Sequence, residues 1–353
     1  MTAWPLRIVV AGAGVIGRRH VELVGGSGEC ALAAIVDPAP AAAAVAAAHG
    51  VPCFASLAGS LAHTRPDGVI LATPNALHVI QALECIAAGV PVLVEKPVAH
   101  SVAEGERLAA AVDRVGARLL VGHHRAHSPI LAAARAVVAA GTIGRIVAVS
   151  GSALFRKPPA YFAEAPWRTQ AGGGPILINL IHEIGNLRSL CGGIAAVHAV
   201  ASSAIRGHAV EDTVAITLRF ASGALGNFLL SDAAASGRSW EQTARENAAY
   251  ATYPDEDCYV IAGTRGSLSV PTMRLKVHAP DAEPSWFTPM AATTMPLARA
   301  DPLERQLAHF CAVIRGEQAP LVSVHDGLAN LRVTEAIAES ARTGKIVAIE
   351  AQE

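Results

Sequence analysis

Three glycines close to the N-terminus have the G-x-G-x-x-G spacing of a turn that holds phosphate: Gly12, Gly14 and Gly17. In such a turn the first glycine allows a tight bend, the second lets the backbone approach a pyrophosphate, and the third lets a helix pack closely on a strand. The pyrophosphate would lie on the positive N-terminus of that helix, where Val15 and Ile16 follow. The spacing therefore predicts a dinucleotide site.

An acid stands where the ribose of a dinucleotide would be. Asp37 comes 20 residues after Gly17, at the end of the second apolar run, and could accept hydrogen bonds from ribose hydroxyls. It is followed by Pro38 and not by an arginine that would hold a 2′-phosphate, which favours NAD over NADP. Arg18 and Arg19 leave NADP open, because they could face a phosphate as well as solvent. A glycine turn for some other ligand is the alternative to the dinucleotide.

The elements needed to position this turn are present in the first third of the chain. Short apolar runs alternate with helix-like segments, a pattern typical of a parallel sheet covered on both faces. With right-handed crossovers it predicts a doubly wound Rossmann domain over residues 1–123. The expected strands are 7–11, 32–36, 68–72, 91–94 and 118–121, and the expected helices are 15–24, 40–49, 76–88 and 101–115.

The pattern changes in residues 124–353. Longer segments with alternating apolar and polar residues predict an α+β domain with an open, mostly antiparallel sheet. The polar residues 232–256 show no clear period and are predicted to form a long loop. The expected strands are 145–155, 196–204, 212–220, 224–231 and 257–262, and the expected helices are 129–140, 175–190, 302–315 and 325–343.

Three further strings, together with the glycine turn, resemble the Gfo/Idh/MocA family of oxidoreductases. They are ATPNALH at 72–78, VEKP at 94–97 and DGLANLRVTEA at 326–336. The resemblance implies an N-terminal NAD(P)-binding domain, residues 1–123, and a C-terminal substrate-binding and oligomerisation domain, residues 124–353. It also implies a substrate held between the two, at the carboxyl ends of the strands.

The resemblance gives roles to two of these turns. By analogy with the family, they line the nicotinamide end of the cofactor through Thr73, Pro74, Asn75, His78, Glu95 and Lys96, and the Lys96–Pro97 bond is cis. An ammonium at Lys96 would stabilise alkoxide charge while a base takes the hydroxyl proton. An ordinary surface lysine at a strand end is the alternative interpretation.

The same resemblance places the base after the triple glycine 172–174. His182 matches the family's histidine, and we interpret it as the general acid/base. The family's acid four residues earlier is replaced by Ile178, and the acid three residues later by Gly185. Asn179 can share a helix face with His182 and would be a polar partner or substrate ligand. Loss of the carboxylate would make His182 less basic. A structural histidine in an inactive site is the alternative.

Other residues are candidates for holding the substrate. Trp167–Arg168 and GTRGSL at 263–268 resemble a branch of the family that acts on carboxylated cyclic dihydrodiols. The planar fork of Arg168 would suit a carboxylate, and Trp167 would shape the pocket. Arg125 and Lys157 could bind the same group. His124, near the start of the second domain, could donate a hydrogen bond to the substrate.

Composition excludes several classes of function. Net charge is −1 with no concentration of Lys and Arg, which argues against nucleic acid. No uncharged run is long enough for a membrane helix, and the N-terminus has no signal-peptide pattern. The six cysteines are scattered and form no CxxC pair, as expected for a reduced, cytoplasmic protein. The cluster His123, His124 and His127 has no acid or Cys at ligand spacing, so we predict no metal.

Together these observations predict an NAD(P)-dependent dehydrogenase. It would oxidise a secondary alcohol of a cyclic small molecule, namely a sugar, a cyclitol or a carboxylated cyclic cis-dihydrodiol. Two alternatives stay open: a cofactor-binding regulator that has lost turnover, and a glycosidase-like enzyme that uses NAD transiently. The open sheet has a face that needs covering, which predicts a homodimer or homotetramer.

Overall fold

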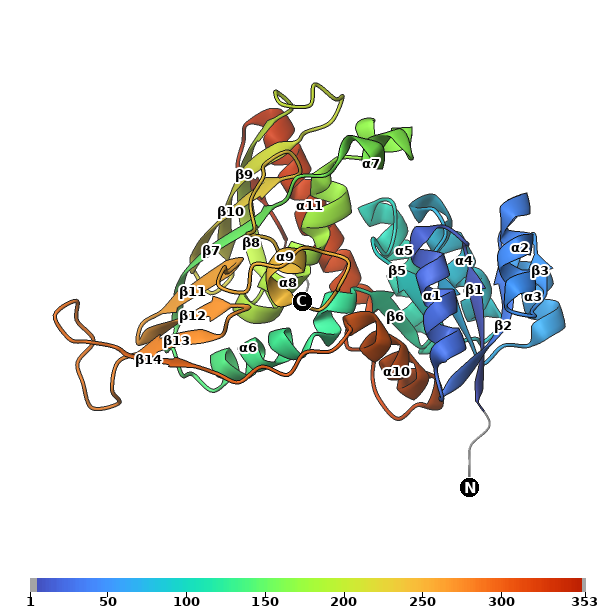
Figure 1. The fold of residues 1–353 in the computed structure, drawn as a ribbon, viewed down its shortest axis with the longest axis horizontal. Helices are drawn as coiled ribbons and strands as arrows, with labels where there is room; N and C mark the ends of the chain where they lie inside the picture. The colour runs from blue at the N-terminus through green and yellow to red at the C-terminus, as the bar shows by residue number, and fades with distance from the viewer. Residues whose placement is uncertain (1–4, 351–353) are drawn as a thin grey trace. The chain divides into compact units, whose positions relative to one another are not determined.

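The computed structural model describes residues 5–350, which form two compact units (Figure 1). Unit 1 runs to His127 and also includes Pro302–Leu331. Unit 2 comprises Ser128–Asp301 and the chain from Arg332 onward. Within residues 5–350, no helix combines the length and apolar character needed to cross a membrane.

Unit 1 contains the predicted doubly wound sheet. Its six strands are all parallel, in the order β3-β2-β1-β4-β5-β6. The order reverses between β1 and β4, and ligands of such sheets bind beyond the carboxyl ends of the strands at that switch point. The strands are β1 (Leu6–Ala11), β2 (Cys30–Val36), β3 (Cys53–Phe54), β4 (Gly68–Leu71), β5 (Val92–Glu95) and β6 (Leu119–Gly122). The helices between them are α1 (Val15–Gly26), α2 (Pro40–Ala48), α3 (Leu57–Thr64), α4 (Asn75–Ala87) and α5 (Val102–Val115).

The sequence analysis did not predict two small elements of unit 1, strand β3 and helix α3. Strand β3 has only two residues, too few for a period to show. Helix α3 follows it and is capped by Ser56, whose hydroxyl accepts from the Gly59 backbone N–H at 3.3 Å. Both complete the βαβ alternation that the longer elements predicted.

The division of the chain differs from the predicted boundary. We expected everything after residue 123 to form the second domain, but unit 1 continues through a 3-10 helix, η1 (His124–His127), and takes in α10 (Pro302–Arg315). The reason is packing: α10 buries Leu307, Phe310 and Cys311 in the same core as β1 and β2. Helix α11 (Val324–Thr343) begins in unit 1 and ends in unit 2.

Unit 2 contains a nine-stranded mixed sheet, in the order β14-β13-β12-β11-β7-β10-β9-β8-β15. Strands β7 and β10 pair in parallel, and the other described pairs are antiparallel, as predicted for the fold class. The strands are β7 (Ile146–Leu154), β8 (Ile194–Ser202), β9 (Thr213–Phe220), β10 (Leu225–Ser231), β11 (Tyr259–Gly263), β12 (Gly266–Val270), β13 (Arg274–Val277), β14 (Ala291–Thr294) and β15 (Val347–Ala348).

One face of this sheet is packed and the other is open. Buried residues of α6 (Pro129–Ala139), α8 (Ile181–Cys191) and the end of α11 share a core with the sheet (Figure 1). Burial alternates strictly along β9 and along most of β10, so every second side chain points away from that core. The outward set includes Leu225 and Leu229 of β10, which are both exposed.

The predicted loop 232–256 is wrong in one respect. It contains a short helix, α9 (Trp240–Ala244), capped by the Ser239 hydroxyl. Trp240 is only 3% exposed and packs in the core of unit 2. A helix of five residues is too short to show a helical period, which is why the sequence indicated a loop.

Candidate active site

The glycine turn of unit 1 has no room for side chains at two of its three glycines. Gly12 has φ +93°, and a Cβ there would lie 2.4 Å from the carbonyl oxygen of Ala72 at the end of β4. A Cβ on Gly17 would lie 1.9 Å from the carbonyl oxygen of Gly12. The first turn of α1 therefore lies directly against the end of β1, as the spacing predicted.

The second glycine of the pattern, Gly14, faces open space. An ideal Cβ on Gly14 meets nothing within 4 Å, and Gly14 caps α1 without a side chain. Val15, the first residue of α1, is 86% exposed, and Ile16 beside it is half-buried. The N–H groups of a bare helix N-terminus are left for an anion. This open cradle fits a pyrophosphate.

Asp37 is held at the same turn, at the end of β2. Its Oδ2 accepts from the Ala13 backbone N–H and its Oδ1 from Ala39, both at 2.8 Å. A carboxylate has about four acceptor positions, so capacity remains for ribose hydroxyls. Arg18 donates through Nε to the Ala13 carbonyl at 3.0 Å, and Arg19 pairs with Glu22 at 3.2 Å. Since both arginines have protein partners, the geometry favours NAD.

The turn after β4 carries Thr73, Pro74 and Asn75. Pro74 precedes α4 and Asn75 begins it, so both lie at a helix N-terminus. The Thr73 hydroxyl donates to Gln81 Oε1, one to two turns into that helix, at 2.7 Å. All three residues lie on the carboxyl-terminal side of the sheet, beside the glycine turn.

His78 lies between the two turns that follow β4 and β5. Its side chain is only 1% exposed, with Nδ1 at 2.8 Å from the Pro97 carbonyl and Nε2 at 2.9 Å from the Thr73 carbonyl. Burial lowers the pKa of His78, although the two backbone contacts oppose that shift. The imidazole joins the turn after β4 to the turn after β5.

Glu95, the last residue of β5, is paired with a histidine that the sequence analysis missed. Its Oε1 lies 2.8 Å from His20 Nε2, and both side chains are buried. Burial alone would raise the pKa of Glu95, but the hydrogen bond and charge of His20, with the charges of Lys96 and His124, lower it. His20 lies on the buried stripe of α1 with Gly17, Val21 and Val24. A polar residue on that stripe was the available signal.

Lys96 follows directly and is anchored by the same carboxylate. Its backbone N–H donates to Glu95 Oε2 at 3.1 Å, and the Lys96–Pro97 bond is cis, as predicted. Gly122 of β6 pairs with Glu95, and a Cβ there would lie 3.0 Å from the Glu95 carboxyl carbon. The strand neighbour is thus small enough to leave space for the buried acid. Lys96 itself is half-buried.

Two of the three histidines after β6, His123 and His127, contact other residues of unit 1. His123 Nε2 lies 3.2 Å from Asn330 Nδ2, and so joins the third family-like string to the end of β6. His127 packs against His309 with ring centroids 5.1 Å apart and ring planes tilted by 57°, and burial lowers the pKa of His127 to about 3. Arg125, a predicted substrate ligand, is only 3% exposed, whereas His124 is half-buried. Among the described residues, no three His, Cys, Asp or Glu gather as a metal site would need.

In unit 2, His182 is the second residue of α8 and is 8% exposed. The segment before it, η3 (Ile176–Leu180), is a π-helix, where we predicted a single α-helix from 175. It contains Ile178 and Asn179, so the i−3 relation between Asn179 and His182 is not that of an ideal α-helix. Such π turns inside helices occur frequently at functional sites.

The triple glycine sets where this helix begins. A Cβ on Gly173 would lie 2.4 Å from the Trp167 carbonyl oxygen, and one on Gly174 would lie 2.3 Å from Glu211 Oε1. Glu211 Oε1 accepts from the Ile176 backbone N–H at 2.9 Å, and burial raises the pKa of Glu211. The two glycines let Glu211 and the 3-10 helix η2 (Pro166–Thr169) close on the helix start.

The remaining predicted substrate residues lie in unit 2. Arg168 donates through Nη1 to the Tyr161 carbonyl at 2.5 Å and stacks 3.8 Å from the centroid of the Tyr161 ring. Trp167 beside it is 56% exposed. Asn179 Oδ1 accepts from Lys157 Nζ at 2.7 Å. The structure thus gives Asn179 a cationic partner and fixes Arg168 on a tyrosine.

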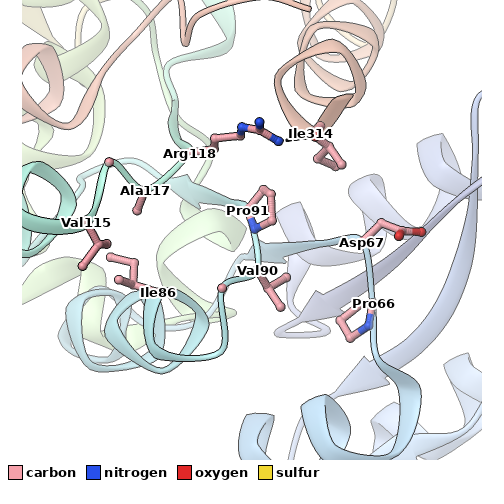
Figure 2. Close-up of a pocket in the computed structure, with 11 residues that line it drawn as sticks. Pro66, Asp67, Ile86, Val90, Pro91, Val115, Ala117, Arg118 and Ile314 are labelled. Carbon is pink, nitrogen blue, oxygen red and sulfur yellow. Dashed lines mark hydrogen bonds between the residues drawn. The ribbon is translucent and has the colours of Figure 1, made fainter. Parts of the chain in front are cut away.

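A separate cavity of about 580 Å³ lies at the amino ends of the unit 1 strands, away from the glycine turn (Figure 2). Its lining comes from the residues that precede β4, β5 and β6, at the amino ends of those strands. Its charged groups already have structural partners: Arg118 donates to the Ile314 carbonyl at 2.8 Å and Asp67 accepts from the Arg7 backbone at 2.7 Å. The glycine turn and Lys96 are at the other ends of the strands.

Comparison with known protein families gives two matches. Residues 6–123 match the oxidoreductase family with an NAD-binding Rossmann fold, and residues 131–269 match the GFO/IDH/MocA C-terminal domain. The chain belongs to the GFO/IDH/MocA family. Its cofactor is therefore a nicotinamide dinucleotide, bound by the Rossmann domain. The protein is an NAD(P)-dependent oxidoreductase.

Similar proteins include several dehydrogenases and a reductase. A 1,5-anhydro-D-fructose reductase of Ensifer adhaerens is 29% identical over 286 residues, 80% of each chain. An inositol 2-dehydrogenase of Rhizobium meliloti is 26% identical and covers 98% of this chain and 99% of its own. The WlbA dehydrogenase of Bordetella pertussis, solved with NADH and UDP-GlcNAcA, has a TM-score of 0.79 at 26% identity, covering 99% of this chain and all of its own.

The buried pair gives a first prediction. His20→Ala should reduce the free energy of unfolding by about 3 kcal/mol, because it leaves the Glu95 carboxylate buried without its partner. Combining it with Glu95→Gln should cost less than the sum of the two single changes, by about 2 kcal/mol. Urea denaturation of the four proteins measures this coupling. Additive effects would show that the pair does not hold the turn.

The pair also has a pH signature. Because the pKa of Glu95 is lowered in the folded protein, its stabilisation is present above the ordinary carboxyl pKa of 4.5 and is lost as the pH falls below it. The stability difference between the unmodified protein and Glu95→Gln should therefore shrink from pH 7 to pH 3. A constant difference across that range would contradict this assignment.

The glycine turn gives a matched pair of variants. Gly17→Ala should cost about 3 kcal/mol of stability or more, because its Cβ meets backbone. Gly14→Ala should cost about 1 kcal/mol or less, since its Cβ enters open space, yet weaken NAD⁺ binding about tenfold if a pyrophosphate lies there. Thermal unfolding and calorimetric titration with NAD⁺ separate the two effects. Unchanged NAD⁺ affinity in Gly14→Ala would contradict the cradle.

Proposed function

We propose that this protein oxidises a secondary alcohol on the ring of a small molecule, by hydride transfer to NAD⁺. The ring belongs to a sugar, a cyclitol or a carboxylated cyclic cis-dihydrodiol. The observation that carries the proposal is the fixed position of Lys96, whose turn is tied by Glu95 and His78 to the edge that holds the glycine turn. The names of the similar reductase and inositol 2-dehydrogenase support a cyclic alcohol or its ketone.

The cofactor is held by the turn residues of unit 1. Backbone N–H groups at Gly14, Val15 and Ile16 receive the pyrophosphate, and Asp37 accepts from the ribose hydroxyls. Thr73, Pro74 and Asn75 line the nicotinamide end together with the Glu95–Lys96 turn. When bound, the nicotinamide supplies the hydride acceptor.

Lys96 and His182 then act on the alcohol itself. The Lys96 ammonium donates to the reacting oxygen and stabilises the negative charge that develops there. His182 accepts the hydroxyl proton. Ile178 leaves His182 without the acid that the family-like pattern would place four residues earlier, so His182 acts without a carboxylate from that position.

Activity with variants tests the proposal. NAD⁺ or NADP⁺ is incubated with sugars, cyclitols and cyclic cis-diol carboxylates while nicotinamide absorbance is recorded. His182→Ala should lower kcat by about 10² to 10⁴ and Lys96→Met by about 10² to 10³. Lys276→Met, an exposed lysine on β13, is the matched control and should leave the rate unchanged.

Two results would overturn this assignment. Tight NAD⁺ binding without reduction across the panel would favour a regulatory protein or a transient use of NAD. Reduction that survives in both Lys96→Met and His182→Ala would show that other groups carry the chemistry.

The open face of the unit 2 sheet supports assembly as a homodimer or homotetramer. Leu225 is 57% exposed and Leu229 41%, and both point outward from β10. Exposed apolar side chains on one face of a sheet favour burial against a second copy. The six free cysteines are consistent with a reducing compartment such as the cytoplasm.

Sedimentation equilibrium tests the assembly. The protein at micromolar concentration should have at least twice the mass of one chain, and Leu225→Glu with Leu229→Glu should lower that mass. Val115→Glu, at a 58% exposed position on α5, should not. A monomer before any substitution would contradict the proposal.

A further inference from the structure

A lysine in unit 2 lies in surroundings that the proposed chemistry does not yet use. Lys157 follows β7, and its side chain is only 10% exposed. Its Nζ donates to Asn179 Oδ1 at 2.7 Å and lies 3.5 Å from the Asp232 carboxylate. A lysine is seldom buried to this extent unless interactions with the protein or a ligand offset the cost of removing its ammonium from water.

Aromatic rings take the place of water around the ammonium. Nζ lies 4.7 Å from the centroid of the Tyr161 ring and 5.6 Å from that of Phe155. Both distances are within the range of cation–π attraction, which is moderate compared with a charge-assisted hydrogen bond. The two rings attract the ammonium weakly, but they carry no net negative charge to neutralise it.

The carboxylate that contacts Lys157, that of Asp232, is shared with a second cation. Asp232 Oδ1 accepts from Arg206 Nε at 2.7 Å, closer than its contact with Lys157, and Arg206 Nη2 also donates to the Lys157 carbonyl at 3.0 Å. Burial lowers the pKa of Lys157 to about 8; Asp232 opposes this, and the charges of Arg206 and Arg168 add to it. The ammonium is therefore incompletely compensated, and a further anion would stabilise it.

The position of Lys157 links this charge to the proposed reaction. Asn179, which accepts its hydrogen bond, is three residues before His182 on the same continuous helical segment, η3 followed by α8. Arg168, in contrast, is held on the carbonyl and ring of Tyr161. Of the two cations, Lys157 is the one attached to the segment that carries the proton acceptor.

We propose that Lys157 is a specificity-determining residue that binds a carboxylate carried by the ring of the substrate, and so selects acidic cyclic alcohols over neutral ones. This inference rests on the proposed function for its link to the reaction. Of the three cations that the sequence offered for a carboxylate, Arg168, Arg125 and Lys157, it selects Lys157, with Asn179 orienting the ammonium.

Binding of a matched pair of ring compounds tests it. Shikimate and its methyl ester have the same ring hydroxyls and differ in the charge of one group. Calorimetric titration of the NADH-loaded protein at pH 7 should show shikimate binding about 10- to 100-fold more tightly than the ester. Lys157→Gln should abolish this preference, Lys157→Arg should keep part of it, and Lys276→Gln, an exposed lysine of the same unit, should keep all of it.

The pH dependence gives a second measurement on the unmodified protein. The charged or titratable groups that face Lys157 are Asp232, Arg206, Arg168, Tyr161 and Glu211. Because Lys157 is charged below a pKa of about 8, the preference for shikimate should be full at pH 6.5 and fall as the pH rises through 8. In Lys157→Arg it should persist to pH 9, since arginine stays charged.

Each other outcome overturns the inference: binding of neither compound, equal binding of the two, or a preference that survives in Lys157→Gln. The result is independent of turnover. A Lys157-dependent preference without any NAD⁺ reduction would sustain the carboxylate site and refute the proposed dehydrogenase. Reduction of NAD⁺ by ring alcohols, with no preference for acidic ones, would sustain the dehydrogenase and refute the carboxylate site.

Discussion

Two buried imidazoles fix the edge of the sheet on which the cofactor site of this protein depends. His20 ties helix α1 to Glu95 at the end of β5, and His78 ties the turn after β4 to Pro97 in the turn after β5. A buried polar group left unpaired costs about 1 to 3 kcal/mol, so none of these contacts can be lost cheaply. The glycine turn, the Thr73 turn and the Lys96 turn consequently keep one arrangement, with the Lys96 backbone bonded to the acid that His20 holds.

A comparable constraint orders the start of the histidine-bearing helix in unit 2. Glu211 bonds the first π-helical N–H at Ile176, and Gly174 leaves the space that this carboxylate fills. Lys157 then bonds Asn179 within the π segment. In both units a buried acidic side chain bonds the backbone beside a group that we propose to be catalytic, Lys96 in one and His182 in the other. Preorganised groups of this kind are what transfer of a proton and stabilisation of an oxyanion require.

The sequence predicted features that depend on local spacing and missed those that depend on tertiary packing. Five of the six strands of unit 1, the tight packing at Gly17 and the cis bond at Lys96–Pro97 follow from short patterns and from the family resemblance. The role of His20 was missed because its partner is 75 residues away. The membership of α10 in unit 1 was missed because an amphipathic helix does not reveal which core its apolar face joins. The π-helix was missed because one widened turn hardly changes the apolar period.

The central claim is that this edge of unit 1 holds a nicotinamide that receives hydride from a ring carbon. Mass spectrometry of the cofactor tests it most directly, after incubation of the protein with NAD⁺ and a ring alcohol deuterated at its carbinol carbons, such as fully C-deuterated myo-inositol or shikimate. The account predicts NADH that carries one deuterium, formed in step with the ketone. A converted ring compound with unlabelled cofactor, or no deuterium in the NADH formed, would contradict it.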